Sequence, residues 1–309
     1  PSHILNNLVE YQSQQAKTYQ SLTGILPVKS FFTELDAKLR EEAGLPAKEK
    51  SLLDTFESDV LNWETYVWAQ AILDSRSIWW EGKRHLVPML DFINCIEGPD
   101  PARVHSTTMD DTNTNAMTAA SWAFAKGEQV FENYGQANYI YFMYHGFALP
   151  IGENTHDCFI HTVKLTDEET KQIDFTDQLA QNVAKQVGFN RSPSVHICMS
   201  IEGAVGAKNH RTGLPQDIWL AMSLKQNNYK SLREQKLLGL PNLSAMQLLH
   251  TQLEARQVAY TAHFAKGDPH KSSTFFLRTE EHHLQGVLRY LRKEIAALGG
   301  TASSSTEEL

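Results

Sequence analysis

The stretch GEQVFENYG at 127–135, together with NYIYFMYHGF at 138–147, decides the fold. Its apolar residues and closing glycine predict a short strand that ends at Tyr134, and a short aromatic helix after it. Upstream, LVPMLDFINC at 86–95 is typical of an apolar strand that ends in the turn-forming Asn94. Two short strand ends and an aromatic helix are therefore expected within about 60 residues of one another along the chain.

Aromatic side chains are concentrated in this region, and two interpretations of them stay open. They are Phe131, Tyr134, Tyr139, Tyr141, Phe142, Tyr144 and Phe147. Such enrichment is typical of core packing, and it also occurs around ligand pockets. The sequence has no GxGxxG, no GxxxxGK[ST] and no CxxC pair. A nucleotide-phosphate cradle and a zinc site are therefore not expected, and no metal is assigned.

These motifs resemble the C-terminal half of a SET domain of the Rubisco large-subunit lysine methyltransferase type. In that family a D-x-x-N-H strand end, a G-E-Q-V-x-x-x-Y-G strand and an N-x-x-x-x-x-x-G-F helix form a knot-like crossing around S-adenosylmethionine. Three segments of this sequence match these motifs in turn: DFINC at 91–95, GEQVFENYG at 127–135 and NYIYFMYHGF at 138–147. The specific part of the resemblance covers about 80 residues.

The resemblance implies roles for individual residues. Tyr134 would be the catalytic residue, with its hydroxyl orienting the substrate amine. The cofactor-binding residues would be Arg76, Asn94, Cys95 and Phe147. Arg76 would pair with the carboxylate of S-adenosylmethionine, and Asn94 would hold the cofactor through its side-chain amide. Phe147 would pack on the adenine, with the Asn94-Cys95 backbone completing that part of the site. Phe142 and Tyr144 would line the substrate channel, although core packing explains these two equally well.

The sequence departs from the family's pattern in two ways. The glycine-rich first segment of the SET domain is not recognisable, and we expect it to lie before residue 1. The family's histidine after Asn94 is Cys95 here, and a thiol is a poor hydrogen-bond donor. The firmest positional expectation is that Tyr134 lies beside the Asn94-Cys95 backbone with its hydroxyl directed into a pocket.

The rest of the chain sets the expected fold class, which is α+β: a partial SET β-fold with inserted helices, then an all-α substrate-binding domain. We expect a partial SET domain at 1–155, with an inserted helical region at about 30–85 and a core at about 86–150. A helical substrate-binding domain is expected at 156–299, and a disordered tail at 300–309. The sequences TDEE at 166–169 and SAMQ at 244–247 have the form of capping boxes at helix starts.

Composition and charge exclude several classes of protein. Apolar residues make up 41% and charged residues 21%, which is close to the globular average and argues against disorder or a coiled-coil rod. Residues 1–150 carry 11 basic and 19 acidic side chains, so the net charge of −8 lies in that half. The basic residues are scattered, so no nucleic-acid partner is expected. The uncharged run 133–152 is too polar for a membrane span, so no membrane partner is expected either.

Three cysteines, an odd number at wide spacing, do not predict a disulfide framework. They favour a reducing, intracellular compartment, with cytoplasm, nucleus and plastid all open. We expect a monomer that transfers a methyl group from S-adenosylmethionine to a lysine of a non-histone protein, docked by the helical domain. Two alternatives stay open, namely a histidine acceptor and a catalytically silent SET-derived binding module.

Overall fold

The computed structural model describes residues 11, 13–17, 41, 63–80, 83–100, 103–104, 107–110, 115–201, 214–267 and 271–302. The chain forms two compact units, which are treated separately below. The N-terminal unit runs from Leu5 to Asp91, and the C-terminal unit comprises the chain from Phe92 onward together with the first four residues. The predicted boundary near residue 155 does not coincide with this division and stays a prediction.

The N-terminal unit contains one well-defined helix and one hairpin. Helix α3 (Trp63–Arg76) is followed directly by β1 (Ser77–Trp80), which pairs antiparallel with β2 (Lys83–Leu86). Arg84 of β2 forms an ion pair with Asp74 of α3, with 2.6 Å between Arg84 Nη1 and Asp74 Oδ1, and so ties the hairpin to the helix. Of the inserted helical region expected at about 30–85, residues 30–62 lie outside the described part of the chain, residue 41 excepted.

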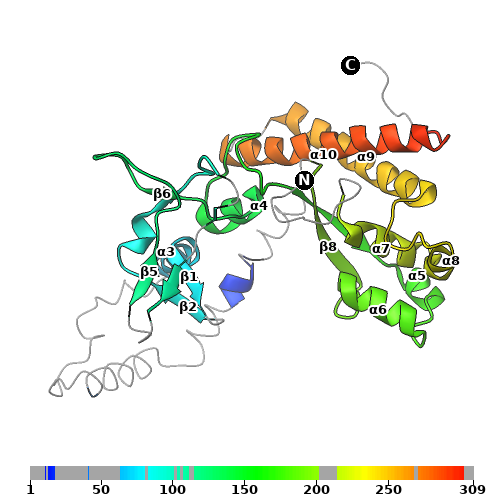
Figure 1. Ribbon diagram of the computed structural model, residues 1–309, viewed down its shortest axis with the longest axis horizontal. Helices are drawn as coiled ribbons and strands as arrows, with labels where there is room; N and C mark the ends of the chain where they lie inside the picture. Colours follow the sequence, from blue (N-terminus) through cyan, green and yellow to red (C-terminus); the bar gives the residue numbers. More distant parts are fainter. Residues whose placement is uncertain are drawn as a thin grey trace. The chain divides into compact units, whose positions relative to one another are not determined.

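The first half of the C-terminal unit is made of very short elements (Figure 1). They are β3 (Asn94–Cys95), β4 (Thr107–Met109), β5 (Ala116–Thr118), β6 (Phe131–Glu132), α4 (Asn138–Ile140) and the π-helical turn η3 (Tyr141–His145), with the 3-10 turn η2 (Leu90–Phe92) at the junction of the units. Strands β4 and β5 pair antiparallel, and β3 pairs parallel with β6. The π-helical turn ends at Gly146, whose φ of 76° is the left-handed conformation that glycine favours at a helix end.

The second half of this unit is not all-helical, so that expectation was wrong. Strands β7 (Phe159–Lys164) and β8 (Ser194–Met199) pair antiparallel, and α5 (Asp167–Gln172) and α6 (Gln178–Val187) lie between them in sequence. In β8, Val195, Ile197 and Met199 are buried while the residues between them are less so. This two-residue alternation is the signature of a half-buried strand. The broader expectation of an α+β fold is confirmed.

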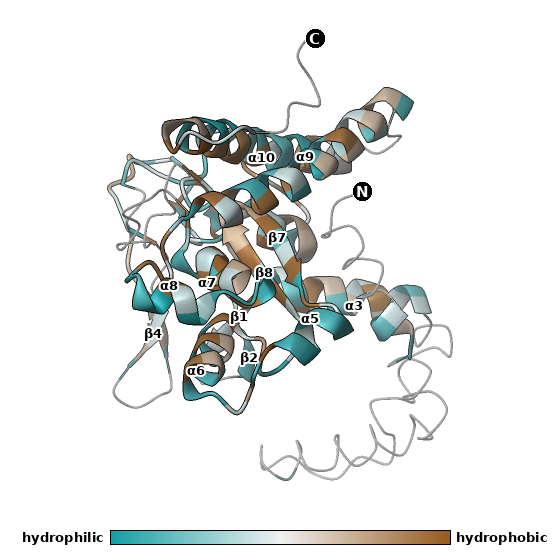
Figure 2. Cartoon of the chain, turned by 90° about the vertical axis from the view of Figure 1, so that its right-hand side faces the viewer, coloured by the Kyte–Doolittle hydropathy of each residue, from teal (hydrophilic) through white to brown (hydrophobic). Residues whose placement is uncertain are grey.

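The core of the C-terminal unit lies between this hairpin and four helices. These are α7 (Gln216–Lys225), α8 (Tyr229–Glu234), α9 (Leu243–Lys266) and α10 (Lys271–Ala297). Helix α7 is buried from Ile218 to Leu224, because its sequence is apolar on every side. Helices α9 and α10 lie side by side in Figure 1, and Figure 2 shows apolar and polar residues on each of them.

Local sequence signals at helix starts were correct in one case and wrong in the other. The Thr166 hydroxyl accepts from the Glu169 backbone and the Glu169 carboxylate accepts from the Thr166 backbone, so this capping box is confirmed. Helix α9 instead begins after Asn242, whose side chain accepts from the Ala245 backbone at 3.0 Å. The Asn242 cap lies two residues upstream of Ser244, and asparagine and serine are about equally good N-caps, so the residue types alone do not fix this start.

Two of the three cysteines are joined, against the expectation from the sequence. Cys158, just before β7, forms a disulfide with Cys198 of β8, and Cys95 is a free thiol. The hairpin register places Ile160 opposite Cys198, so the bond runs diagonally between neighbouring strands. A separation of 40 residues concealed this pairing in the sequence. Among the helices of the described residues, none has the length and apolar character needed to cross a bilayer.

Candidate functional site

Two segments far apart in sequence cross at β3 and β6. Asn94 pairs with Phe131 and Cys95 with Glu132 in a parallel ladder, and the Ile96 backbone N–H donates to the Glu132 carbonyl at 3.1 Å. Parallel neighbours need a crossover connection, and here it is the chain between 96 and 130. We call this arrangement, with Tyr134 and the residues that surround it, the crossing site.

Tyr134 lies two residues beyond the end of β6 and reaches back across the crossing. Its hydroxyl donates to the Ile93 carbonyl at 2.6 Å, beside Asn94. The expected neighbourhood of Tyr134 and the Asn94 strand end is therefore present. The hydroxyl proton is directed at this backbone carbonyl, which differs from the expectation of a hydroxyl aimed into a pocket.

Tyr141 is the centre of the aromatic packing around Tyr134. It is fully buried, and its ring stacks on Phe147 at 5.0 Å and meets Tyr134 edge-on at 6.2 Å. His145 lies 5.5 Å from the Tyr134 ring. Burial raises the pKa of Tyr141, so its hydroxyl stays protonated, and it accepts from the Gln136 backbone at 3.1 Å. The sequence marked Tyr141 only as one of many aromatics, and nothing distinguished it as the central one.

Cys95 is held at the same place by its neighbours. Burial raises the pKa of this thiol, an effect partly offset by hydrogen bonds from the Tyr134 backbone and the Tyr141 hydroxyl. A neutral thiol is a weak nucleophile. Cys95 therefore contributes packing and weak hydrogen bonds at the crossing site rather than reactivity.

The expected cofactor-binding residues are placed unequally. Asn94 is exposed on β3, and no hydrogen bond joins its side chain to another described residue. Phe147 is half-buried with one face on Tyr141. Arg76 belongs to the N-terminal unit, where its guanidinium donates to the Asp91 carbonyl at 2.6 Å. The binding role of each of these residues stays a prediction.

The two expected channel residues follow Tyr141 on the π-helical turn. Phe142 stacks almost parallel on Phe276 of α10, with ring centroids 4.6 Å apart, and Phe276 is fully buried. This contact corresponds to core packing, one of the two interpretations left open by the sequence. Tyr144 is half-buried. It lies close enough to Tyr139 to affect its ionisation: burial is the main cause that raises the pKa of Tyr139, and the electrostatic interaction with Tyr144 raises it further.

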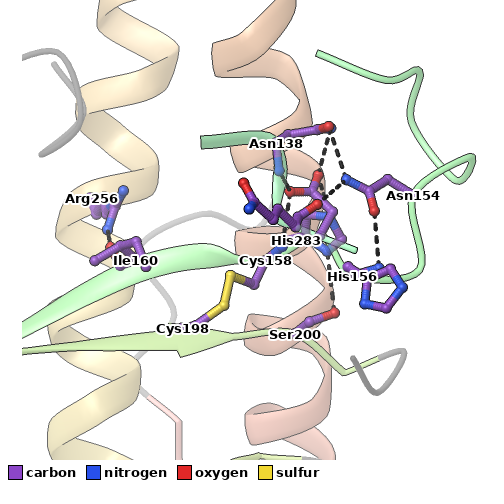
Figure 3. The surroundings of a disulfide bond; sticks show 11 residues. Asn138, Asn154, His156, Cys158, Ile160, Cys198, Ser200, Arg256 and His283 are labelled. Carbon is purple, nitrogen blue, oxygen red and sulfur yellow. Dashed lines mark hydrogen bonds and ion pairs between the residues drawn. A yellow bond between two sulfur atoms is a disulfide. The ribbon is translucent and has the colours of Figure 1, made fainter. Parts of the chain in front are cut away.

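A second polar cluster lies next to the disulfide (Figure 3). We call Asn138, Asn154, Asp157, Ser200 and His283 the Asp157 cluster. The Asp157 carboxylate accepts four hydrogen bonds, from the Asn138 backbone at 2.8 Å, the Asn138 amide at 2.9 Å, the Cys158 backbone at 2.9 Å and His283 Nε2 at 3.0 Å. Asn138 Oδ1 in turn accepts from the Leu149 backbone and from Asn154, each at 3.0 Å.

This cluster connects the motif at 138–147 to helix α10. His283 comes from α10, and its second ring nitrogen lies 3.4 Å from the Ser200 hydroxyl. That distance is long for a hydrogen bond, so we assign Ser200 and Asp157 to holding the imidazole in place rather than to nucleophilic chemistry. Sequence reasoning identified Asn138 within its motif but missed Asp157, Ser200 and His283, because no local pattern joins residues so far apart.

Comparison with known proteins gives matches among solved structures only. No family model matches the chain, and no curated protein matches it. One match is the crystal structure of the SET domain of LSMT bound to lysine and AdoHcy, at 18% identity and a TM-score of 0.49. The alignment covers 90% of this chain and 65% of that one, so the chain spans less than two thirds of the solved protein. Similarity at this level does not assign a family.

Proposed function

We propose that this chain is a SET-type methyltransferase that transfers a methyl group from S-adenosylmethionine to a protein lysine. One observation carries the proposal: the hydrogen bond from Tyr134 to Ile93 beside the parallel pairing of β3 and β6. It joins the two motif segments in the kind of crossing that the sequence resemblance implies. A buried tyrosine that served packing alone would not require this neighbour.

The residues of the crossing site fit such a cofactor. The exposed Asn94 amide can donate and accept hydrogen bonds, as the polar part of S-adenosylmethionine requires. The half-buried Phe147 ring offers an aromatic face of the kind that packs on adenine. When bound, S-adenosylmethionine supplies an activated methyl group on a sulfonium.

The chain's own contribution is to orient and desolvate the acceptor amine. A lysine must lose its proton before it can attack, and aromatic surroundings such as Tyr134, Tyr141 and Phe147 disfavour the charged form. The Tyr134 hydroxyl donates a hydrogen bond to the Ile93 carbonyl, and its oxygen still carries lone pairs that can accept from an amine N–H placed beside it. Alignment of this kind is the main requirement of a direct displacement.

The substrate is proposed to be a non-histone protein that docks on the helical part of the C-terminal unit. The charge distribution agrees with a basic acceptor segment, because the excess negative charge lies in residues 1–150, which contain the crossing site. A histidine acceptor would need a polar partner in the channel. His145, 5.5 Å from the Tyr134 ring, is the residue to examine for that alternative.

The test is transfer of a radiolabelled methyl group from S-adenosylmethionine to protein in a cell extract, with mass spectrometry of the modified peptide. Tyr134→Phe keeps the ring and removes the hydroxyl, so we expect transfer to fall by about ten- to a thousandfold. Cofactor affinity should change less, because the hydroxyl acts on the amine. Tyr229→Phe, in α8 outside the crossing site, is the matched control and should retain full transfer.

The outcomes separate the alternatives clearly. A label on histidine replaces the lysine proposal by its histidine alternative. Micromolar cofactor binding by calorimetry without transfer to any protein favours a binding module. Two results would remove the proposal. In the first, the chain neither binds S-adenosylmethionine nor transfers a methyl group. In the second, Tyr134→Phe transfers methyl groups as fast as the parent protein does.

A further inference from the structure

A cavity of about 320 Å³ lies along helix α10, apart from the crossing site. Its lining residues are Ile201, His282, His283, Gly286, Arg289, Tyr290 and Lys293. Six of these seven come from α10, where spacings of three and four residues bring them onto one side of the helix. A cavity of this volume lies at the lower end of the range for small-molecule sites.

The helix is built so that this side stays open. Gly286 lies in the middle of α10, where glycine costs about 1 kcal/mol relative to alanine. A Cβ added to Gly286 would lie 3.9 Å from Arg289 Nη2 and 4.0 Å from Ile201 Cδ1, in ordinary contact with two residues of the lining. A larger side chain at position 286 would therefore occupy the cavity without a backbone clash.

One wall of the cavity is fixed by the Asp157 cluster. His283 contacts Asp157 with Nε2 and Ser200 with Nδ1, so both ring nitrogens already have protein partners (Figure 3). The imidazole of His283 therefore shapes the wall and does not bind a ligand through its nitrogens. A preformed wall lowers the entropy cost of binding.

The charge of the lining selects an anion. Arg289 and Lys293 are exposed, and neither belongs to an ion pair between described residues, whereas the neighbouring Arg292 pairs with Glu254 at 3.2 Å. Among the described residues that line the cavity there is no carboxylate. Two positive charges about one helical turn apart are balanced by a dianion, and a guanidinium matches the geometry of phosphate oxygens.

The remaining lining selects an organic body for that anion. The Ile201 side chain and the Tyr290 ring are apolar surfaces next to the two cations. We propose that this pocket binds a small phosphate monoester whose body is apolar or aromatic. The phosphate contacts Arg289 and Lys293, and the body packs against Tyr290 and Ile201. The proposal does not rest on methyltransferase activity.

The experiment is calorimetric titration of the full chain with phenyl phosphate as the probe. We expect saturable one-to-one binding that weakens as salt is raised, since ion contacts are screened. Inorganic phosphate lacks the ring and phenol lacks the charge, so each should bind at least about tenfold more weakly. The double substitution Arg289→Gln with Lys293→Gln should weaken phenyl phosphate binding by at least about tenfold.

Two further variants separate binding from folding. Gly286→Leu keeps every charge and favours the helix, yet fills the cavity, so binding should be lost while thermal stability is kept. Lys185→Gln removes one exposed charge on α6, outside the lining, and should bind phenyl phosphate as the parent does.

Some results would overturn the proposal. One is that the parent protein shows no binding of phenyl phosphate at a probe concentration of about 10 mM. Another is binding that Gly286→Leu leaves unchanged. A phosphotyrosine peptide that binds more than about tenfold tighter than phenyl phosphate would replace the small molecule by a protein ligand.

Discussion

Asp157→Ala should destabilise the C-terminal unit severely, because this carboxylate is a buried acceptor of four hydrogen bonds. Its partners are the backbone N–H groups of Asn138 and Cys158, the Asn138 amide and His283. The side chain is about 5% exposed. Each bond to a charged group contributes about 1.5–3 kcal/mol, and removing one side of a buried charged pair costs about 3–5 kcal/mol.

We expect a loss of about 4 kcal/mol in the free energy of unfolding, below the sum of the four bonds because freed donors rehydrate in part. At about 2–4 °C per kcal/mol for a unit of this size, Tm should fall by roughly 8–16 °C. Asp157→Asn keeps the volume and one acceptor oxygen, so it should cost about half as much.

Urea unfolding monitored by circular dichroism, together with calorimetric Tm, measures both variants. Asp217→Ala is the matched control, since the Asp217 carboxylate accepts one 3.4 Å contact from Gln186 at the surface, and it should cost less than about 1 kcal/mol. If Asp157→Ala costs no more than this control, the assignment of the Asp157 cluster as a structural centre is refuted.

Two other variants test pH dependence and backbone conformation. Burial, with a smaller effect of the Arg256 charge, lowers the pKa of His161 to about 4, whereas the pKa of a histidine in the unfolded chain is about 6.5. Between these two pH values the unfolded chain binds a proton that the folded chain does not, so stability should fall as the pH is lowered from 6.5 to 4. His161→Gln should remove roughly 2 kcal/mol of that fall between pH 7 and pH 4.5, measured as urea stability at the two pH values, and an unchanged slope would contradict the assignment. Gly135 has a φ of 66° and its added Cβ would lie 2.6 Å from the Val104 side chain, so Gly135→Ala should cost about 2 kcal/mol or more in a melting experiment. The Val104 Cβ itself would lie 2.9 Å from the added Cβ, so Gly135→Ala should cost less in a Val104→Gly background, and an unchanged cost there would show that the contact is not the cause.

The parts of the fold that the sequence predicted are those set by neighbouring residues. The Thr166 capping box needs only the four residues 166–169. Strand β8 carried an equally local signal in its alternating residues. We predicted helix there because the surrounding sequence is helical.

The parts that the sequence could not predict depend on contacts between distant residues. The disulfide joins positions 40 apart, and Asp157 and His283 are separated by 126 residues. At the crossing site, the proximity of Tyr134 to Ile93 followed from resemblance to a family and not from residue pattern. The direction of the Tyr134 hydroxyl, toward a carbonyl, depends on the exact crossing of two strands and no sequence pattern encodes it.

The disulfide between Cys158 and Cys198 turns the segment between them into a closed covalent loop that carries α5 and α6. A protease that cuts after the exposed Lys185 would therefore break the chain without releasing a fragment. Both pieces would migrate as one species on a non-reducing gel and would separate only after a thiol reductant is added. Fragment mass under the two conditions thus reports whether the bond exists in a given preparation, independently of folding or activity.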